Sequence, residues 1–155
     1  MATTFTSSPQ TLGRASTSGD LWLFAYGSLM WRPDFEHLEA VPARLSGYHR
    51  RFCLYSHVYR GTPGAPGLVL GLDRGGSCWG RAFRIAAAQV HDVMLRVDRR
   101  ELLQDVYCRR TLPIRLGGRG ASGERVRAEA YVVNRTNPQY TGRLSTEETV
   151  ALIRQ

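Results

Sequence analysis

The segment LWLFAYGSL at residues 21–29 decides the fold of this 155-residue chain. Its first six residues form an apolar and aromatic run, which is typical of a buried core strand. The Gly27-Ser28 step ends this run, and such a turn leaves backbone N–H groups without partners at the end of the strand. A compact anion or the oxygen of a polarised carbonyl suits these donors. An ordinary strand-to-loop turn that binds nothing is the alternative that this segment alone leaves open.

The rest of the chain predicts several strands around one helix. Strands are expected at residues 21–26, 44–48, 51–55, 68–72, 78–85, 107–116 and 126–134, and a helix at residues 86–102. The Asp-Arg-Gly-Gly sequence at 73–76 predicts a hairpin turn between two of these strands, and residues 33–39 predict a short turn or helical piece. The expected fold class is therefore α+β, a small mixed β-barrel or highly curved sheet with packed helices.

One loop stands out by its composition. Residues 60–67 (RGTPGAPG) hold three glycines and two prolines, so they predict an irregular connection. Loops of this kind often lie over functional sites. A plain surface connection is equally consistent with the composition.

Composition limits the class of protein. At 43% hydrophobic and 22% charged residues the chain has an ordinary globular composition, and its length suits one domain. No apolar run approaches the length that crosses a bilayer, so no membrane partner is expected. Residues 1–20 are rich in Ser and Thr and hold no apolar segment. They predict a disordered leader, not a secretory signal, before a domain at residues 21–155.

Charge and cysteine content also exclude some functions. The net charge of +8 comes from 21 arginines and no lysine, with no run of arginines longer than two. This spread indicates a compositional bias, and a nucleic-acid partner is not expected. Cys53, Cys78 and Cys108 are odd in number and far apart, and the histidines are equally scattered. We therefore expect no metal, no disulfide and a cytoplasmic location.

The predicted helix carries one carboxylate on its apolar face. At about 100° per residue, Glu101 falls at the centre of a stripe formed by Val90, Met94 and Val97. Three arginines fall on the far side of the helix: Arg96, Arg99 and Arg100. Burying a carboxylate is unfavourable unless it is paired or its pKa rises. Such groups gather at functional sites, so Glu101 is the candidate catalytic residue.

Two structural explanations of Glu101 stay open at this point. The helix could end before residue 101 and leave the carboxylate in solvent, or Glu101 could pair with a nearby arginine or backbone amide. Asp98, at the edge of the same stripe, is the second candidate. No serine elbow, phosphate-binding loop or dinucleotide fingerprint is present, so no cofactor is expected. The remaining parts suit proton transfer on a substrate that supplies its own nucleophile.

Six segments in order resemble a known family. They are FAYGSLMW (24–31), GYHRRF (47–52), RGTPG (60–64), CWGRAFR (78–84), DRRE (98–101) followed by VY (106–107), and NPQYTG (137–142). They are spread over about residues 21–153 and resemble the ChaC-type, glutathione-specific branch of the gamma-glutamylcyclotransferase superfamily.

The resemblance implies a small mixed barrel that needs no cofactor and has glutathione as its substrate. Members of this family cleave its gamma-glutamyl amide and release 5-oxoproline and cysteinylglycine. By residue match, Glu101 is the base, and the loop at residues 26–29 holds the gamma-glutamyl moiety largely through backbone groups. The substrate-binding segment implied by the match comprises Leu23, Phe24, Ala25, Tyr26, Gly27, Ser28 and Leu29.

The chain departs from the family pattern at three places. Position 25 is Ala where the family usually has Gly, and position 105 is Asp where many relatives have a small residue. The sequence also ends at Gln155, before an Asn-x-Glu-Tyr-Leu segment whose tyrosine helps to line the site in relatives. We therefore expect a domain that is short at its C-terminus. A cyclotransferase for other gamma-glutamyl amides or amines, and a binding domain without turnover, are the alternative functions.

Overall fold

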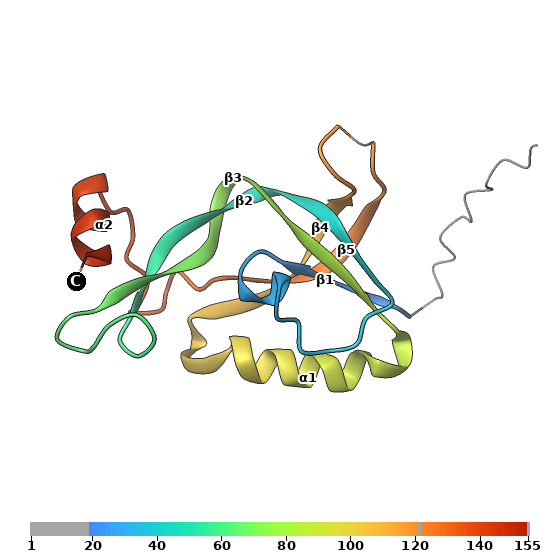
Figure 1. Cartoon of the computed structure of the whole chain (residues 1–155), viewed down its shortest axis with the longest axis horizontal. Coiled ribbons are helices and arrows are strands. Elements are labelled where there is room, and N and C mark those ends of the chain that lie inside the picture. The colour runs from blue at the N-terminus through green and yellow to red at the C-terminus, as the bar shows by residue number, and fades with distance from the viewer. Residues whose placement is uncertain (1–18, 121, 155) are drawn as a thin grey trace, which may run out of the picture.

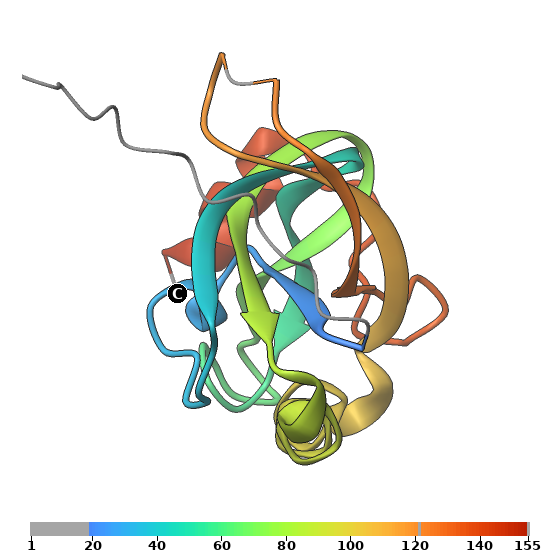
Figure 2. The same cartoon turned by 90° about the vertical axis from the view of Figure 1, so that its right-hand side faces the viewer.

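A closed five-stranded barrel forms the centre of the described structure, a computed structural model that describes residues 19–120 and 122–154. The strands follow the order β1-β3-β2-β4-β5 around the barrel. Their bounds are Leu21–Ala25 (β1), Glu39–Ser56 (β2), Gly67–Ile85 (β3), Tyr107–Leu116 (β4) and Arg125–Val133 (β5). Figure 1 shows the long β2–β3 ribbon, and Figure 2 shows the barrel from one end. The predicted α+β barrel is confirmed.

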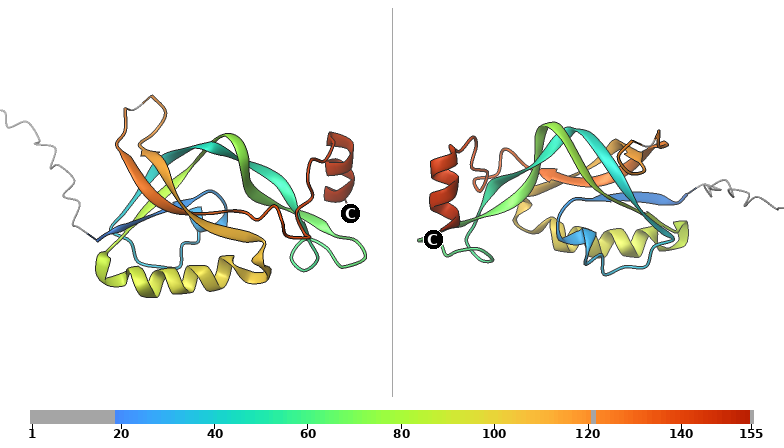
Figure 3. Two further views of the ribbon diagram at one scale, coloured as in Figure 1. Left: turned by 180° about the vertical axis from the view of Figure 1, so that it is seen from behind. Right: turned by 45° about the horizontal axis from the view of Figure 1, so that its top comes forward.

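Among the described residues, two helices pack against the strands, one on the barrel and one on the β2–β3 ribbon. Helix α1 (Val90–Glu101) runs along one side of the barrel, and α2 (Thr146–Ile153) lies near the outer end of the β2–β3 ribbon (Figures 1 and 3). Short 3-10 turns occupy Ser28–Met30, Ala87–Gln89 and Leu103–Asp105. No helix in the described part of the chain is long and apolar enough to cross a membrane. The predicted leader lies outside the described residues except for positions 19 and 20, so that boundary stays a prediction.

Strand β1 closes the barrel because both of its edges are paired. It runs antiparallel to β3, with Leu23 opposite Phe83, and parallel to β5, with Leu23 opposite Glu129. Successive side chains of a strand point to opposite faces. Accordingly, Phe24 packs inside the barrel, while Leu23 and Ala25 pack on the face that α1 covers. This double burial explains why the sequence of β1 is apolar at nearly every position.

Helix α1 presents the predicted apolar stripe to the barrel. Val93, Met94 and Val97 are buried against β1 and β3. Because the helix is amphipathic, its orientation is set by this stripe, and the helix ends with Glu101 on the barrel side. The first turn of the predicted helix is instead a 3-10 turn, Ala87–Gln89.

The predicted hairpin across residues 73–76 is wrong. Strand β3 runs without interruption from Gly67 to Ile85 and pairs with β2 along its length. Gly75 and Gly76 have positive φ angles of 104° and 66° and sit at a register shift opposite Gly47. A glycine pair suits a bulge as well as a turn, and here β2 supplies a partner strand on both sides of it.

Two further expectations change in detail. The segments at 44–48 and 51–55 are parts of one strand, β2, and the true hairpin joins β2 to β3 through residues 57–66. The short helical piece lies earlier than predicted, at Ser28–Met30, and residues 31–38 lead into β2 without a helix.

A buried carboxylate fastens the segment after β5 to the ribbon. Asp73 is 1% exposed and accepts hydrogen bonds from Arg51 Nη1 at 2.9 Å, Arg135 Nε at 2.8 Å and the Tyr140 hydroxyl at 3.0 Å. Burial alone would raise the pKa of Asp73, but the hydrogen bonds from Arg135, the Arg74 backbone and Tyr140 lower it. The carboxylate is therefore charged in the folded protein at neutral pH.

Gly80→Ala tests the close approach of β3 to the end of β1. A Cβ at Gly80 would overlap the Ala25 carbonyl oxygen and lie 2.7 Å from Phe24 Cζ. We expect a loss of about 1–3 kcal/mol in the free energy of unfolding, measured by urea denaturation. Gly118→Ala is the control, because nothing lies within 4 Å of a Cβ there. Equal stabilities of the two variants would contradict this packing.

Asp73→Asn tests the charged cluster. It leaves Arg51 and Arg135 without their counter-charge, so we expect a loss on the order of 3 kcal/mol at neutral pH. Because the pKa of Asp73 is lowered on folding, its contribution is present at neutral pH and is lost as the pH falls below about 4. The stabilities of wild type and variant should thus converge in acid. Asp92→Asn, at an exposed position on α1, is the control; a gap that persists in acid would contradict the assignment.

Candidate active site

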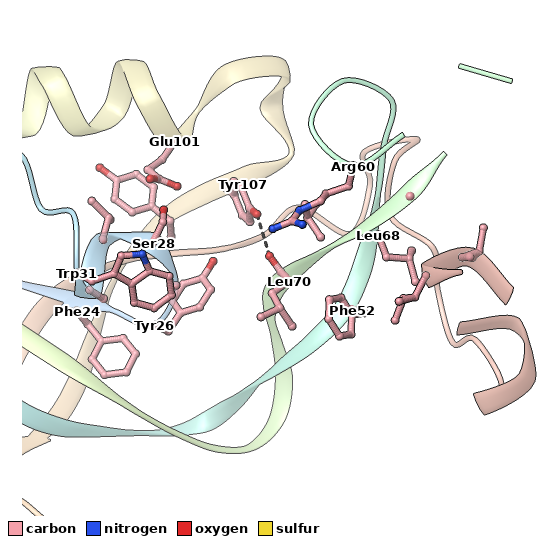
Figure 4. Close-up of a pocket in the computed structure, with 18 residues that line it drawn as sticks. Phe24, Tyr26, Ser28, Trp31, Phe52, Arg60, Leu68, Leu70, Glu101 and Tyr107 are labelled. Atoms are coloured by element: carbon pink, nitrogen blue, oxygen red, sulfur yellow. Dashed lines mark hydrogen bonds between the residues drawn. The ribbon is translucent and has the colours of Figure 1, made fainter. Parts of the chain in front are cut away.

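A cavity of about 550 Å³ opens where β1 ends. Its walls come from the end of β1, the loop that follows it, the end of α1, the start of β4, the base of the β2–β3 connection and the end of α2 (Figure 4). The lining residues used below are Phe24, Ala25, Tyr26, Gly27, Ser28, Leu29, Arg60, Leu68, Leu70, Glu101, Tyr107 and Tyr131. Segments far apart in the sequence therefore meet at one hollow.

The loop after β1 offers backbone donors to this cavity. Ser28–Met30 forms one 3-10 turn, and Gly27 caps it without a side chain. The first N–H groups of a helical turn have no partner within the turn, which leaves those of Ser28 and Leu29 available. A Cβ at Gly27 would meet nothing within 4 Å, so the space beside the loop is open. A turn therefore follows β1 where the sequence predicted one, and the binding of an anionic oxygen by its N–H groups stays a prediction.

Two arginines hold this loop in place. Arg50 on β2 donates from Nε to the Tyr26 carbonyl at 2.7 Å and also bonds to the Trp79 carbonyl. Arg100 donates from Nη2 to Ser28 Oγ at 2.7 Å and from Nη1 to the Arg32 carbonyl at 2.9 Å. The helical wheel placed Arg100 on the far side of α1, which is wrong for its guanidinium. A long side chain can fold back toward a neighbouring loop, and a wheel drawn at Cα cannot show this.

Glu101 reaches the cavity from the last residue of α1. Its side chain is 18% exposed, and its Oε1 lies 3.3 Å from Arg100 Nε. Burial raises the pKa of this carboxyl, and the charge of Arg100 opposes the rise. Of the two structural explanations, exposure at a frayed helix end is excluded, whereas an arginine partner is present. The carboxylate still faces the cavity beside that partner (Figure 4).

Two tyrosines complete the surroundings of Glu101. Burial raises the pKa of both Tyr26 and Tyr107, and the nearby charge of Glu101 adds to each rise. Both phenols are therefore neutral at physiological pH. The Tyr107 hydroxyl donates to the Leu70 carbonyl at 3.0 Å, which fixes its ring between β4 and β3. Sequence reasoning noted Tyr107 only as part of a motif and assigned it no place in the site.

The predicted site residues fall into two groups. Phe24 to Leu29 and Glu101 all line the cavity. Leu23 does not line the cavity; it is fully buried on the face of β1 that packs against α1. The second candidate, Asp98, binds Arg109 Nη1 at 2.6 Å and the Tyr131 hydroxyl at 2.7 Å. Asp98 thus serves the packing of α1 on the barrel.

A second hollow adjoins the first. It has a volume of about 410 Å³ and shares four lining residues with the main cavity: Ser28, Val69, Glu101 and Tyr107. Glu101 therefore lies where two spaces meet, and a ligand longer than one amino acid has room on either side of it. Among the described residues, no group of three or more His, Cys, Asp or Glu side chains is placed to hold a metal ion.

Comparison with solved structures defines the class of fold. A crystal structure of a gamma-glutamylcyclotransferase specific to glutathione from yeast matches with a TM-score of 0.74 at 19% sequence identity, covering 87% of this chain and 78% of that one. At this identity the likeness concerns the fold. The closed barrel with its packed helices is that of the gamma-glutamylcyclotransferases.

Sequence comparison then gives the family. The family model of ChaC-like proteins matches residues 21–155. A glutathione-specific gamma-glutamylcyclotransferase 1 from Danio rerio is 34% identical over 135 residues, which are 86% of this chain and 68% of that protein. The glutathione-specific gamma-glutamylcyclotransferase of Escherichia coli is 32% identical over 130 residues, which are 84% of this chain and 54% of the relative. This chain belongs to the ChaC-like protein family, and the predicted resemblance is confirmed.

Arg100→Gln tests the electrostatics of Glu101. The variant removes the positive charge that lowers the pKa of the Glu101 carboxyl, while burial remains. We therefore expect the midpoint of its titration, followed by NMR of side-chain-labelled glutamate, to move to higher pH. Arg99→Gln, at an exposed position on the same helix, should leave the midpoint unchanged. An unchanged or lower midpoint in Arg100→Gln would contradict the pairing.

Proposed function

We propose that this protein cleaves the gamma-glutamyl amide of glutathione by intramolecular cyclisation and releases 5-oxoproline and cysteinylglycine. The observation that carries the proposal is the Glu101 carboxylate, partly buried at the edge of a cavity whose other wall is the loop Tyr26–Leu29. Relatives in the ChaC-like family that are named for this reaction support the choice of substrate. A cytoplasmic location belongs to the proposal and is supported by three free cysteines.

Glu101 acts as the base in this mechanism. Its carboxylate accepts a proton from the α-ammonium of the substrate, and the freed amine attacks the γ-carbonyl carbon of the same molecule. The new C–N bond closes a five-membered lactam, while the bond to the cysteinyl nitrogen breaks. Glu101 gives this proton to the leaving nitrogen. The second proton, which the attacking nitrogen loses as it becomes the lactam N–H, goes to the released amine, which leaves as an ammonium, so the reaction consumes no water. General acid and base assistance of this kind contributes about 10²- to 10⁴-fold in rate.

The raised pKa of Glu101 suits this double role. A carboxylate with the usual pKa is a weak base at neutral pH, and a higher value brings it nearer to the operating pH. Burial supplies the rise in pKa, and the positive charge of Arg100 opposes it by favouring the ionised carboxylate. The phenols of Tyr26 and Tyr107 near Glu101 are neutral, so they add no second negative charge beside the carboxylate.

The loop supplies orientation and charge stabilisation. The N–H groups of Ser28 and Leu29 are suited to an anionic oxygen of the substrate, either the α-carboxylate or the oxyanion that develops at the γ-carbon. Because nucleophile and electrophile belong to one molecule, the main task is to hold its cyclising conformer. Orientation of this kind can supply on the order of 7–11 kcal/mol. Arg50 and Arg100, which anchor the loop, serve that task.

Glu101→Gln tests the mechanism. The amide keeps the size of the side chain but cannot accept the proton, so 5-oxoproline release from glutathione should fall by at least about 100-fold. Stability in urea should not fall at neutral pH, because the variant removes a carboxylate whose raised pKa makes its ionised form unfavourable to folding. Glu124→Gln, at an exposed position before β5, is the matched control. Unchanged product formation by Glu101→Gln would exclude this mechanism.

The choice of substrate separates the alternatives. If gamma-glutamylalanine releases 5-oxoproline as fast as glutathione or faster, the protein is a cyclotransferase for other gamma-glutamyl compounds. Binding of glutathione in calorimetry without any 5-oxoproline would indicate a binding domain.

A further inference from the structure

The main cavity carries one charge of each sign. Among the described residues that line it, Glu101 and Arg60 are the charged ones, and the others are aromatic, aliphatic or small. Figure 4 shows Glu101 entering from the end of α1 and the Arg60 guanidinium extending from the β2–β3 connection, with Tyr107 between them in that view. A ligand that spans this cavity therefore meets a negative group in one part and a positive group in another.

The backbone of Arg60 is held firmly although its loop is rich in glycine. The hydroxyl of Ser56, a residue that is 6% exposed, accepts hydrogen bonds from the N–H groups of Tyr59 and Arg60 at 3.2 and 3.1 Å. Gly67 packs so closely that a Cβ there would lie 2.9 Å from Arg60 Cβ and would overlap the Arg60 carbonyl oxygen. The base of the loop is thus fastened on both sides of Arg60.

The tip of the same loop is also closed. Thr62 and Ala65 exchange backbone hydrogen bonds of 3.0 and 3.1 Å. The connection from β2 to β3 is therefore an ordered turn, and it brings Arg60 to the cavity wall. Positioning before binding reduces the entropy that a charged side chain loses when it engages a ligand.

Arg60 differs from the other arginines near the site. Arg50, Arg51 and Arg100 each donate to backbone or side-chain oxygens of the protein. Within residues 19–120 and 122–154, no carboxylate forms an ion pair with Arg60. Its five N–H donors are arranged to bind a carboxylate through two parallel hydrogen bonds.

We propose that Arg60 binds the carboxylate at the far end of the substrate and so selects gamma-glutamyl peptides that end in a free carboxylate. This inference rests on the proposed function, which places the α-ammonium of the substrate at Glu101. In glutathione the second free carboxylate belongs to the glycine, at the opposite end of the molecule from the reacting bond. The substrate then presents its α-ammonium to the negative Glu101 and its glycine carboxylate to the positive Arg60.

The contact acts on binding and not on the chemical step. Arg60 engages a part of the substrate whose charge does not change during cyclisation, so the ground state and the transition state gain equally. Loss of the contact should therefore raise KM and leave kcat close to its original value. Because Arg60 is exposed, the contact should also weaken as salt concentration rises.

The experiment compares glutathione with its glycine monoethyl ester, in which the far carboxylate is neutral. In the wild type we expect kcat/KM for 5-oxoproline release to be about tenfold higher for glutathione. In Arg60→Gln this ratio should fall toward one through a higher KM for glutathione, and Arg60→Lys should restore part of it. Arg99→Gln, on the exposed face of α1, should keep the wild-type ratio.

The outcomes separate this inference from the function on which it rests. Turnover of glutathione with an equal rate for the ester in the wild type, or a ratio unchanged in Arg60→Gln, overturns the role of Arg60 and leaves the cyclotransferase proposal standing. Absence of 5-oxoproline from both substrates with wild-type protein overturns both. A loss in Arg60→Gln that appears in kcat and equally for both substrates also overturns the role, since it indicates a displaced loop.

Discussion

The pairing of β1 on both of its edges is the constraint on which the site depends. Because β3 and β5 occupy the two edges, β1 cannot shift its register without breaking the barrel on both sides. The strand must therefore end at Ala25, where the antiparallel pairing with Arg81 stops. The chain leaves the barrel just after that point and forms a tight 3-10 turn, whose first residues, Ser28 and Leu29, line the cavity. A rigid strand thus positions a loop that has no sheet partners of its own.

The second constraint is the direction of α1. The same apolar contacts that fix the helix on the barrel, through Val93 and Val97, carry the carboxylate of Glu101 to the cavity. A charged group in this position is unfavourable for folding, and its raised pKa expresses that cost. Arg100 compensates for part of it while also bonding to the loop after β1. One arginine therefore contacts both the Glu101 carboxylate and the loop after β1.

Local patterns in the sequence predicted much of this arrangement. An apolar run, a helical stripe and a Gly-Ser step are signals within one segment. Strand β1, helix α1 and the position of Glu101 on the barrel side of that helix were therefore predicted correctly, while its catalytic role stays a prediction. Contacts between segments had no such signal. The turn at Gly75-Gly76 has the composition of a hairpin, and only the presence of β2 as a continuous partner makes it a bulge. Arg60 was noted within a motif, but its place at the cavity depends on the folded β2–β3 connection.

The long β2–β3 ribbon has a consequence for how such a site changes over time. Its base belongs to the barrel, and its outer end carries a connection that is remote from β1 and α1 along the chain (Figure 1). The groups suited to bond making and the group suited to recognising the far end of a ligand therefore sit on separate elements. Substitution of a few residues at the ribbon tip can therefore change which ligands bind, while the barrel and α1 keep their structure.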